Sequence, residues 1–222
     1  MKEEFEKLVA AEKIAHKHVE LLLALVESGY CQHRSWGFGR ITQVDPVFAR
    51  FHIDFEDKPG HSMDLAFGAE TLKPIPSDHI LARKAQDMDS VRQMAALHPL
   101  DLIKIVLQSN GGKATVDQIQ GMLTPDVIDE DWRKWWNSAK RAMKKDGHFV
   151  VPLKKSQPIV YQEEEVSLLA RLMQEFRAAK GLKARLLVAT EIVKNFEDIE
   201  EPDADIREVI EMLNVEIASH PR

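Results

Sequence analysis

The sequence predicts an α+β, mostly helical fold, in which a small SH3-like β-barrel and a winged-helix-like domain are followed by a C-terminal helical segment. Apolar and polar residues alternate within residues 30–76, which indicates short strands there. Residues 98–161 have the order helix, helix, helix, hairpin, and from residue 163 onward apolar residues recur at helical spacing. The expected domains are 1–29 for an N-terminal amphipathic helix, 30–76 for the barrel, 77–97 for a helical linker, 98–162 for the winged-helix-like domain and 163–222 for the helical segment.

Residues 3–28 are predicted to form one amphipathic helix. Phe5, Leu8 and Leu25 belong to a series of apolar residues near helical spacing, and Gly29 is a natural stop. Because the apolar face of this helix has to be covered, we expect it to pack on a later helix or on a second chain.

The barrel is predicted from several short strands in a small stretch of chain. Phe51 and Ile53 alternate with polar neighbours, and the turn that follows has Pro59 and Gly60 at positions that suit their backbone angles. Folds of this kind bind proteins or nucleic acids more often than they catalyse reactions, which is a fold-level analogy. The expected strands are 39–44, 49–56, 61–67 and 71–75.

Trp36 and Phe38 stand between glycines within this module. They are either core aromatics or an exposed aromatic edge that docks a partner or stacks on a base, and we take them as candidate docking residues. Cys31 and His33 contain metal-capable atoms, but no paired Cys or His spacing accompanies them. We therefore expect no metal site and no cofactor.

Residues 131–145 form the most distinctive helix of the sequence. Trp132, Trp136 and Met143 fall on one stripe, and basic residues occupy the other side. This pattern is typical either of a core helix with a solvated charged face or of a helix that presents cations to phosphate or to an acidic protein. The candidate contact residues on this helix and on the hairpin that follows are Arg133, Lys134, Lys140, Arg141, Lys144, Lys145, Lys154 and Lys155.

The position of this helix favours the second interpretation. It is the third helix before a hairpin, and residues 130–155 contain eight Lys and Arg against three acids, a local charge of +5 in a chain of net charge −6. Asn137 is the only amide on the helix, so we do not expect sequence-specific DNA recognition. Contact with a nucleic-acid backbone or an acidic protein surface fits better.

The C-terminal segment is predicted to contain an acidic loop at residues 197–205. Between residues 191 and 216 there are ten acids against two bases. Such a loop is usually a solvated turn and helix cap, but its carboxylates are also suited to hold Mg²⁺ or to meet a basic partner. A basic middle and an acidic tail can also contact each other.

The sequence contains no pattern typical of an enzyme site, so we expect no enzymatic activity. The N-terminus is too acidic for a signal peptide, and the apolar run at residues 21–26 is too short to span a bilayer. The single Cys31 fits a reducing compartment, so a cytoplasmic location without membrane contact is expected. The oligomeric state is left open.

Residues 31–41, 53–55 and 61–65, together with 132–136 and 139–140, resemble the N-terminal extension of long transcript-cleavage factors of the GreA/GreB family. The barrel also resembles, more loosely, the Tudor-like modules with which transcription-coupled repair and helicase proteins bind RNA polymerase. The match covers most of residues 30–161. It implies RNA polymerase as a partner, near nucleic acid.

The resemblance does not carry over cleavage activity. In the Gre family cleavage belongs to a long N-terminal coiled-coil finger with acidic residues at its tip, and the helix at 3–28 is too short for both arms. The expected function is a non-enzymatic transcription-associated protein that docks on RNA polymerase, with its basic helix and wing on DNA or RNA backbone. The alternatives are a protein-interaction scaffold without nucleic acid, and metal-dependent catalysis through the acidic loop.

Overall fold

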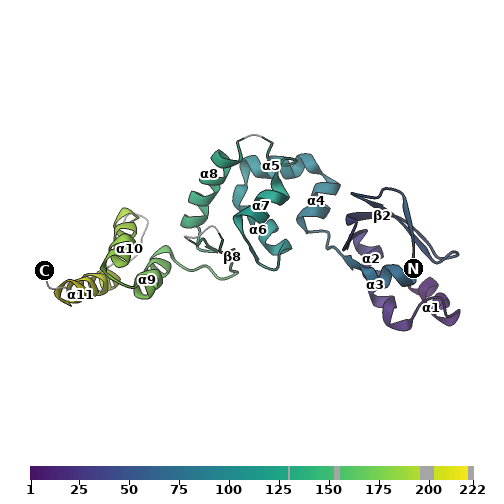
Figure 1. The fold of residues 1–222 in the computed structure, drawn as a ribbon, viewed down its shortest axis with the longest axis horizontal. Coiled ribbons are helices and arrows are strands. Elements are labelled where there is room, and N and C mark those ends of the chain that lie inside the picture. Colours follow the sequence, from purple (N-terminus) through teal and green to yellow (C-terminus); the bar gives the residue numbers. More distant parts are fainter. Residues whose placement is uncertain (130, 153–155, 196–202, 220–222) are drawn as a thin grey trace. The chain divides into compact units, whose positions relative to one another are not determined.

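The structure is a computed structural model that describes residues 1–129, 131–152, 156–195 and 203–219 (Figure 1). It confirms the α+β class with mostly helical content and antiparallel sheets. The chain divides into two compact units, residues 1–109 with 122–128, and residues 110–121 with 129–222. In the part of the chain that the structure describes, no helix combines the length and the apolar composition needed to cross a membrane.

The first unit contains a five-stranded antiparallel sheet of order β4-β3-β2-β1-β5. β1 pairs with both β2 and β5, so the last strand returns beside the first. Among the described residues the edge strands β4 and β5 are not paired with each other, so closure into an SH3-like barrel stays a prediction. The strands are β1 (Tyr30–His33), β2 (Gly37–Asp45), β3 (Arg50–Phe55), β4 (His61–Asp64) and β5 (Leu72–Pro74).

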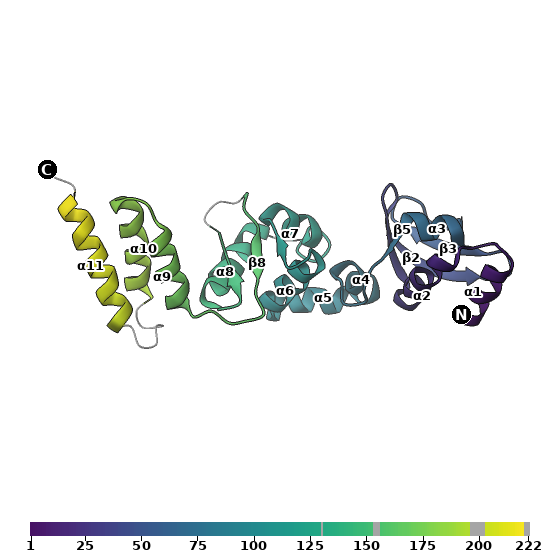
Figure 2. The same cartoon turned by 90° about the horizontal axis from the view of Figure 1, so that it is seen from below.

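The apolar face of the sheet forms the core of this unit. Phe51, Ile53 and Phe55 are buried while Arg50 and Asp54 are exposed, as the alternation in β3 predicts. The helix α2 (Val19–Ser28) packs against β1, β2 and β5 (Figure 2). Arg50 and Asp54 lie on the other face of the sheet, on which Tyr30 of β1 is buried in a second, smaller apolar cluster with Ile75 and Ala82.

Gly39 allows β2 to approach two core side chains closely. A Cβ at this position would lie 2.6 Å from a ring carbon of Phe55 and 2.9 Å from Cγ2 of Ile53. We expect Gly39→Ala to lower the free energy of unfolding by about 1–3 kcal/mol, because the core would have to shift. The matched variant Gly121→Ala meets no atom within 4 Å and should stabilise its helix by about 0.5–1 kcal/mol. Urea denaturation of both variants measures the change in the free energy of unfolding, which should be negative for Gly39→Ala and positive for Gly121→Ala. Equal changes would contradict the close packing of Gly39 as the cause.

The prediction of one helix over residues 3–28 is wrong. The structure has α1 (Lys2–Ala10), a short 3₁₀ turn (His16–His18) and α2. Glu12 adopts a positive φ of 59°, which ends the first helix, and Ile14 is buried after it. On a continuous helix Ile14 would lie opposite Phe5, and Glu12 would lie on the apolar face. Breaking the helix lets both apolar segments pack against the same core.

The expected strand at 61–67 is correct only as far as residue 64. Residues Leu65–Thr71 form the helix α3, because Leu65 and Ala69 are buried one helical turn apart. Gly68 in this helix lets the Phe51 ring come close, since a Cβ there would lie 3.1 Å from it. The sequence analysis also missed β1, which pairs on both of its sides.

Residues 77–97, expected as a helical linker, form α4 (Ile80–Gln86) and α5 (Met88–Leu97), and α6 (Pro99–Ser109) opens at Pro99 as predicted. Ile80 and Val91 are buried. The backbone N–H of Ile80 donates to Oγ of Ser109 at 2.9 Å, and Lys84 pairs with Asp126 at 2.8 Å. These contacts hold the helices of the first unit together.

The helix α7 (Val116–Leu123) begins with the predicted capping box. The backbone N–H of Thr115 donates to Oε1 of Gln118 at 2.8 Å, and the N–H of Gln118 donates to Oγ1 of Thr115 at 3.3 Å. The second unit then contains α8 (Trp132–Lys145) and a sheet of order β6-β8-β7. Its strands are β6 (Lys113–Ala114), which was not predicted, β7 (Phe149–Val150) and β8 (Ile159–Tyr161), which form the predicted hairpin.

The chain continues with three helices that lie side by side in both views, α9 (Leu168–Ala178), α10 (Leu182–Lys194) and α11 (Asp203–Ser219) (Figures 1 and 2). Phe176, Met173 and Ile192 form part of their shared core. We refer to these helices as the C-terminal bundle.

Candidate polyanion-binding face

The helix α8 buries one stripe and exposes the opposite one. Asp131 caps its start by accepting the backbone N–H of Lys134 at 3.1 Å. Trp136 and Met143 are buried, whereas Trp132 is half-buried, with its ring stacked on that of Trp136 at a centroid distance of 5.4 Å. The predicted aromatic inner face is therefore present in part, since only Trp136 of the three tryptophans is buried and Trp132 and Trp135 are half-buried.

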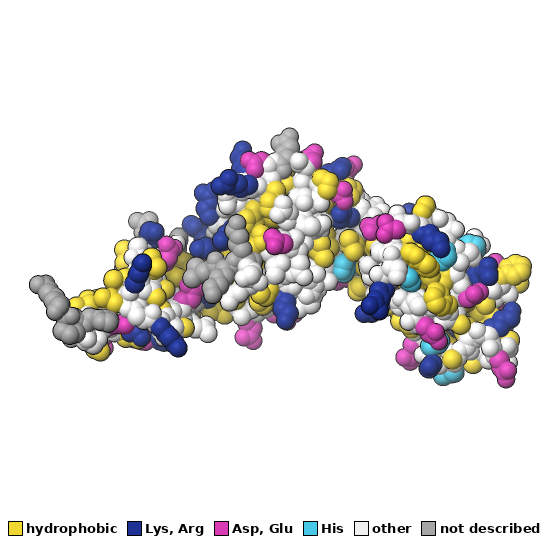
Figure 3. All heavy atoms as spheres, in the orientation of Figure 1, with side chains coloured by type: hydrophobic (Ala, Val, Ile, Leu, Met, Phe, Trp, Pro, Cys, Tyr) yellow, Lys and Arg dark blue, Asp and Glu magenta, His cyan; other side chains and the backbone are white. Residues whose placement is uncertain are grey.

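The outer side of α8 carries the basic residues, together with the exposed Asn137 and Ser138. The helix has six Lys and Arg and no acid over its 14 residues, and their side chains gather over α8 in Figure 3. Arg133, Lys134, Arg141 and Lys144 are exposed, as is Lys145, and Lys140 is half-buried. Within the described ranges no carboxylate pairs with Arg133, Lys134, Lys140 or Lys144. We call these six side chains the α8 basic face.

Two carboxylates of α11, those of Glu208 and Glu216, are engaged within the C-terminal bundle. Arg177 of α9 donates two hydrogen bonds to Glu208, at 2.7 and 2.5 Å, and Arg185 of α10 donates to Glu216 at 2.5 Å. The hydrogen bond from Arg177 holds the pKa of Glu208 below its usual range. Among the residues that the structure describes, no carboxylate of α11 forms an ion pair with Arg133, Lys134, Lys140 or Lys144.

Arg171 of α9 supports the end of α8, a role that was not predicted from the sequence. Its guanidinium donates to the carbonyl of Lys144 at 2.9 Å and to the carbonyl of Phe149 at 2.6 Å. Burial lowers the pKa of Arg171, and Glu175 and Asp146 oppose that shift. A cation at the last carbonyls of α8 also interacts favourably with the helix dipole. The only signal in the sequence was a basic residue beside an apolar stripe.

The turn after α8 is tightly packed. The Asp146 carboxylate accepts the backbone N–H of His148 at 2.9 Å and lies 3.0 Å from Nδ1 of its ring. The backbone N–H of Val166 donates to the carbonyl of Gly147 at 3.0 Å, and a Cβ on Gly147 would collide with Glu165. The end of α8 is thus fixed from two sides, by this turn and by Arg171.

Two of the candidate contact residues, Lys154 and Lys155, lie outside the described residues. The base of their hairpin is described, and it pairs Val150 with Val160. Most of the acidic loop at 197–205 also lies outside the described residues. In the remainder, no group of three or more His, Cys, Asp or Glu side chains converges as metal ligands would, and burial raises the pKa of the Cys31 thiol to about 12.

Trp36 and Phe38 do not form one common edge. Trp36 is half-buried, stacks on His33 at 4.1 Å between ring centroids, and carries Nζ of Lys58 at 4.5 Å above its ring. Phe38 stacks instead on Tyr30 at 5.6 Å and packs against a different apolar cluster. Each ring already has partners within the chain, so neither stands alone as a docking side chain.

His33 gives this region a pH dependence. Its Nδ1 accepts the backbone N–H groups of Ser35 at 3.1 Å and Trp36 at 3.2 Å. Burial lowers its pKa, and the pKa of His61 is lowered by burial and then by Lys58 and His33. The unfolded chain therefore takes up protons first as the pH falls below about 6.5, so stability is full above that pH and declines below it.

We expect His33→Asn to weaken this decline, because an amide oxygen accepts the same two hydrogen bonds and does not titrate. Urea denaturation at several pH values from about 7.5 down to about 5 measures the slope. Part of the decline should remain in this variant, because the pKa of His61 is also lowered in the folded chain. An unchanged slope would show that His33 titrates alike in the folded and unfolded chain.

Residues 81–166 match the model of the GRAD helix-turn-helix domain. A protein named transcription elongation factor GreA from Chlamydia trachomatis serovar D is 30% identical over 171 residues, which cover 75% of this chain and 24% of that protein. Its namesake from Chlamydia pneumoniae is 29% identical over 158 residues, 69% of this chain and 22% of that protein. A putative GreA-associated domains protein from Treponema pallidum (strain Nichols) is 26% identical over 197 residues, 85% of this chain and 28% of that protein.

The chain spans about a quarter of the length of the curated relatives it matches. No solved structure is significantly similar to it. The match to the helix-turn-helix model includes α8 and the hairpin β7–β8, which carry the candidate contact residues.

Proposed function

We propose that this chain, which carries a GRAD helix-turn-helix domain and is related over most of its length to extended GreA-like elongation factors, is a non-enzymatic module that docks on RNA polymerase and lays the α8 basic face on nucleic-acid backbone. The relatives that are named are transcription elongation factors. A role beside RNA polymerase would place the chain in the cytoplasm. The proposal assigns it no cleavage activity.

The observation that carries the proposal is the row of cations on α8, four of which (Arg133, Lys134, Lys140 and Lys144) have no carboxylate partner among the described residues. Six cations lie on a helix of 14 residues, which is about 21 Å long. Duplex DNA has one phosphate charge for about every 1.7 Å of its axis. A cation that binds phosphate releases condensed counterions, so the four α8 cations that have no carboxylate partner in the described part of the chain gain free energy on a polyanion.

The same helix argues against reading of base sequence. Asn137 is exposed but is the only amide on α8, whereas recognition of adenine commonly uses Asn or Gln and recognition of guanine uses Arg aimed at base edges. The proposed contacts are therefore with phosphate and sugar, which position a protein without selecting a sequence.

Docking on RNA polymerase is proposed for the sheet of the first unit and for the helix-turn-helix domain. The names of the relatives support this partner, and a small antiparallel sheet of this kind commonly serves as a binding module.

The second candidate function is a scaffold in which the α8 basic face meets an acidic protein surface. The half-buried Lys140 is compatible with either partner.

Two binding measurements test the proposal. Anisotropy of a labelled duplex, titrated at increasing salt, should give a linear decrease of log K with log salt, with a slope of about −3.6 to −5.4 for four to six phosphate contacts. Purified bacterial core RNA polymerase should co-elute with the chain. Polymerase binding without DNA binding at low salt would favour the scaffold, and the absence of both would refute the proposal.

A further inference from the structure

Three tryptophan rings lie against one another at the start of α8. The ring of Trp132 is nearly parallel to that of Trp135, at an interplanar angle of 28°, and to that of Trp136, at 17°, with 5.4 Å between the centroids in each pair. Trp136 is buried, whereas Trp132 and Trp135 are half-buried. The group of rings therefore extends from the core to the surface. We call Trp132 and Trp135 the outer indoles.

The outer indoles form an aromatic patch at the surface. A single exposed apolar side chain is normal on a protein, but adjacent large rings that keep part of their area in solvent are typical of a binding site. The buried residues of α8 are Trp136, Ala139 and Met143. The helix thus has an apolar stripe apart from the outer indoles, whose exposed area offers a flat surface to a ligand.

The α8 basic face begins beside these rings. Arg133 and Lys134 are exposed and follow Trp132 directly in the sequence. Acids precede the helix at residues 129–131. The Asp131 carboxylate accepts the backbone N–H of Lys134 at 3.1 Å, where the positive end of the helix dipole offsets part of its charge. Cations and flat rings therefore share the first turn of α8.

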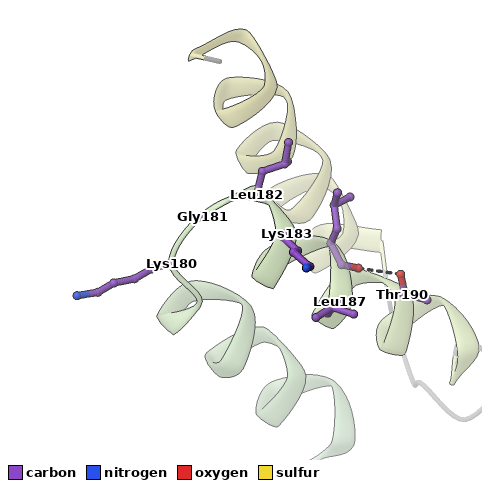
Figure 4. Close-up of a pocket in the computed structure, with 7 residues that line it drawn as sticks. Lys180, Gly181, Leu182, Lys183, Leu187 and Thr190 are labelled. Carbon is purple, nitrogen blue, oxygen red and sulfur yellow. Dashed lines mark hydrogen bonds between the residues drawn. The ribbon is translucent and has the colours of Figure 1, made fainter. Parts of the chain in front are cut away.

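The hollow on α10 combines cations with apolar side chains but not with rings (Figure 4). Lys180 and Lys183 line it together with Leu182 and Leu187. None of the described residues that line it is aromatic. The hollow therefore offers charge without a surface on which a base could stack, whereas α8 offers both.

We propose that the α8 basic face prefers single-stranded nucleic acid, whose unpaired bases stack on the outer indoles while its phosphates lie on the basic side chains. This inference rests on the proposed function and names the form of nucleic acid. Bases in a duplex are paired and stacked on each other, whereas unpaired bases can be splayed out onto aromatic side chains. Stacking tolerates any sequence because every base has a π-face, which agrees with a helix that has Asn137 as its only amide.

The test compares nucleic acids of equal length on the full chain. Anisotropy measures the affinity for labelled oligothymidylate, oligouridylate and a duplex, each about 12 nucleotides or base pairs long. Phosphate contact alone favours the duplex, because each contact there releases about 0.9 counterions against about 0.7 on a single strand. With stacking, a single strand should bind at least about fivefold more tightly than the duplex at the same salt. The tighter of the two single strands shows whether DNA or RNA is the source.

Substitution of Trp135 separates stacking from charge. Trp135→Leu should lower the affinity for oligothymidylate by about fivefold to fiftyfold, and should change the duplex affinity much less, because no cation is removed. Trp135→Phe keeps a ring and should lose much less affinity for the single strand. The control Phe48→Leu removes a ring that is 72% exposed in the other unit, and should leave every affinity unchanged.

Several results would overturn the inference. One is a natural chain that binds single strands no more tightly than the duplex, a comparison that depends on no variant; the duplex affinity would then still support the proposed function. Another is a Trp135→Leu variant with unchanged far-UV circular dichroism that loses affinity for both forms alike, or that binds oligothymidylate as tightly as Trp135→Phe. A chain that binds neither form would refute the proposed function itself.

Discussion

Replacing Arg133, Lys140 and Lys144 together by alanine should lower the affinity for duplex DNA by about one to two orders of magnitude at low salt. The three side chains lie on one side of α8 and have no carboxylate partners among the described residues. Each phosphate contact contributes about 0.9 to the slope of log K against log salt, so the slope should become shallower by about 2 to 3. Because none of the three belongs to the buried stripe, the helix should remain folded.

The matched control removes the same charge elsewhere. Lys17, Arg40 and Lys73 are exposed cations of the first unit, and their replacement by alanine gives the same net charge as the α8 triple variant. DNA affinity and its salt slope should be nearly unchanged in this control, because exposed charges act locally at ordinary salt. An equal loss in both triple variants would show that net charge, and not the α8 basic face, governs binding.

Arg171→Met should destabilise the second unit by about 1.5–3 kcal/mol for each hydrogen bond from the charged group that is lost. The guanidinium donates to the carbonyls of Lys144 and Phe149, which belong to α8 and β7. Methionine fills a similar volume but leaves both carbonyls without this donor. Hydrogen exchange at the amides of 144–149 and urea denaturation measure the loss.

Arg171→Lys distinguishes charge from geometry. A lysine keeps the cation near the end of α8 but lacks the planar fork that donates to two carbonyls at once. Its stability should therefore lie between that of the natural chain and that of Arg171→Met. Equal stability of all three proteins would mean that the two hydrogen bonds contribute nothing net.

The parts of the fold that the sequence predicted correctly depend on local patterns. The capping box of Thr115 and Gln118 involves two residues three positions apart, and the buried stripe of α8 repeats over a single helix. The turn before β4 follows from the adjacent Pro59 and Gly60, the latter with a φ of +66°. In each case the residues that decide the structure are neighbours in the sequence.

The errors involve contacts between distant residues. The break at Glu12 becomes favourable only because Ile14 reaches a core that β3 provides. The strand β1 has no clear alternation and is stabilised by pairing with β2 and β5 on its two sides. Pattern within a short window cannot reveal partners that lie tens of residues away.

The basic residues of the candidate site could be predicted from the sequence, but the contacts that hold α8 in place could not. The basic residues of α8 follow from sequence spacing, but the role of Arg171 depends on α9 returning to the end of α8. The prediction that Trp36 and Phe38 form one docking edge assumed that residues close in the sequence have the same surroundings in the fold. In the structure their rings belong to two different clusters.

The positions of the tryptophans allow binding to be followed by the intrinsic fluorescence of the chain. Of its four tryptophans, three lie in α8, beside the proposed phosphate contacts, and the fourth is Trp36 in the first unit. Replacing Trp36 by phenylalanine would confine the tryptophan fluorescence to α8. Occupancy of that helix by any ligand could then be followed without attaching a dye to either molecule.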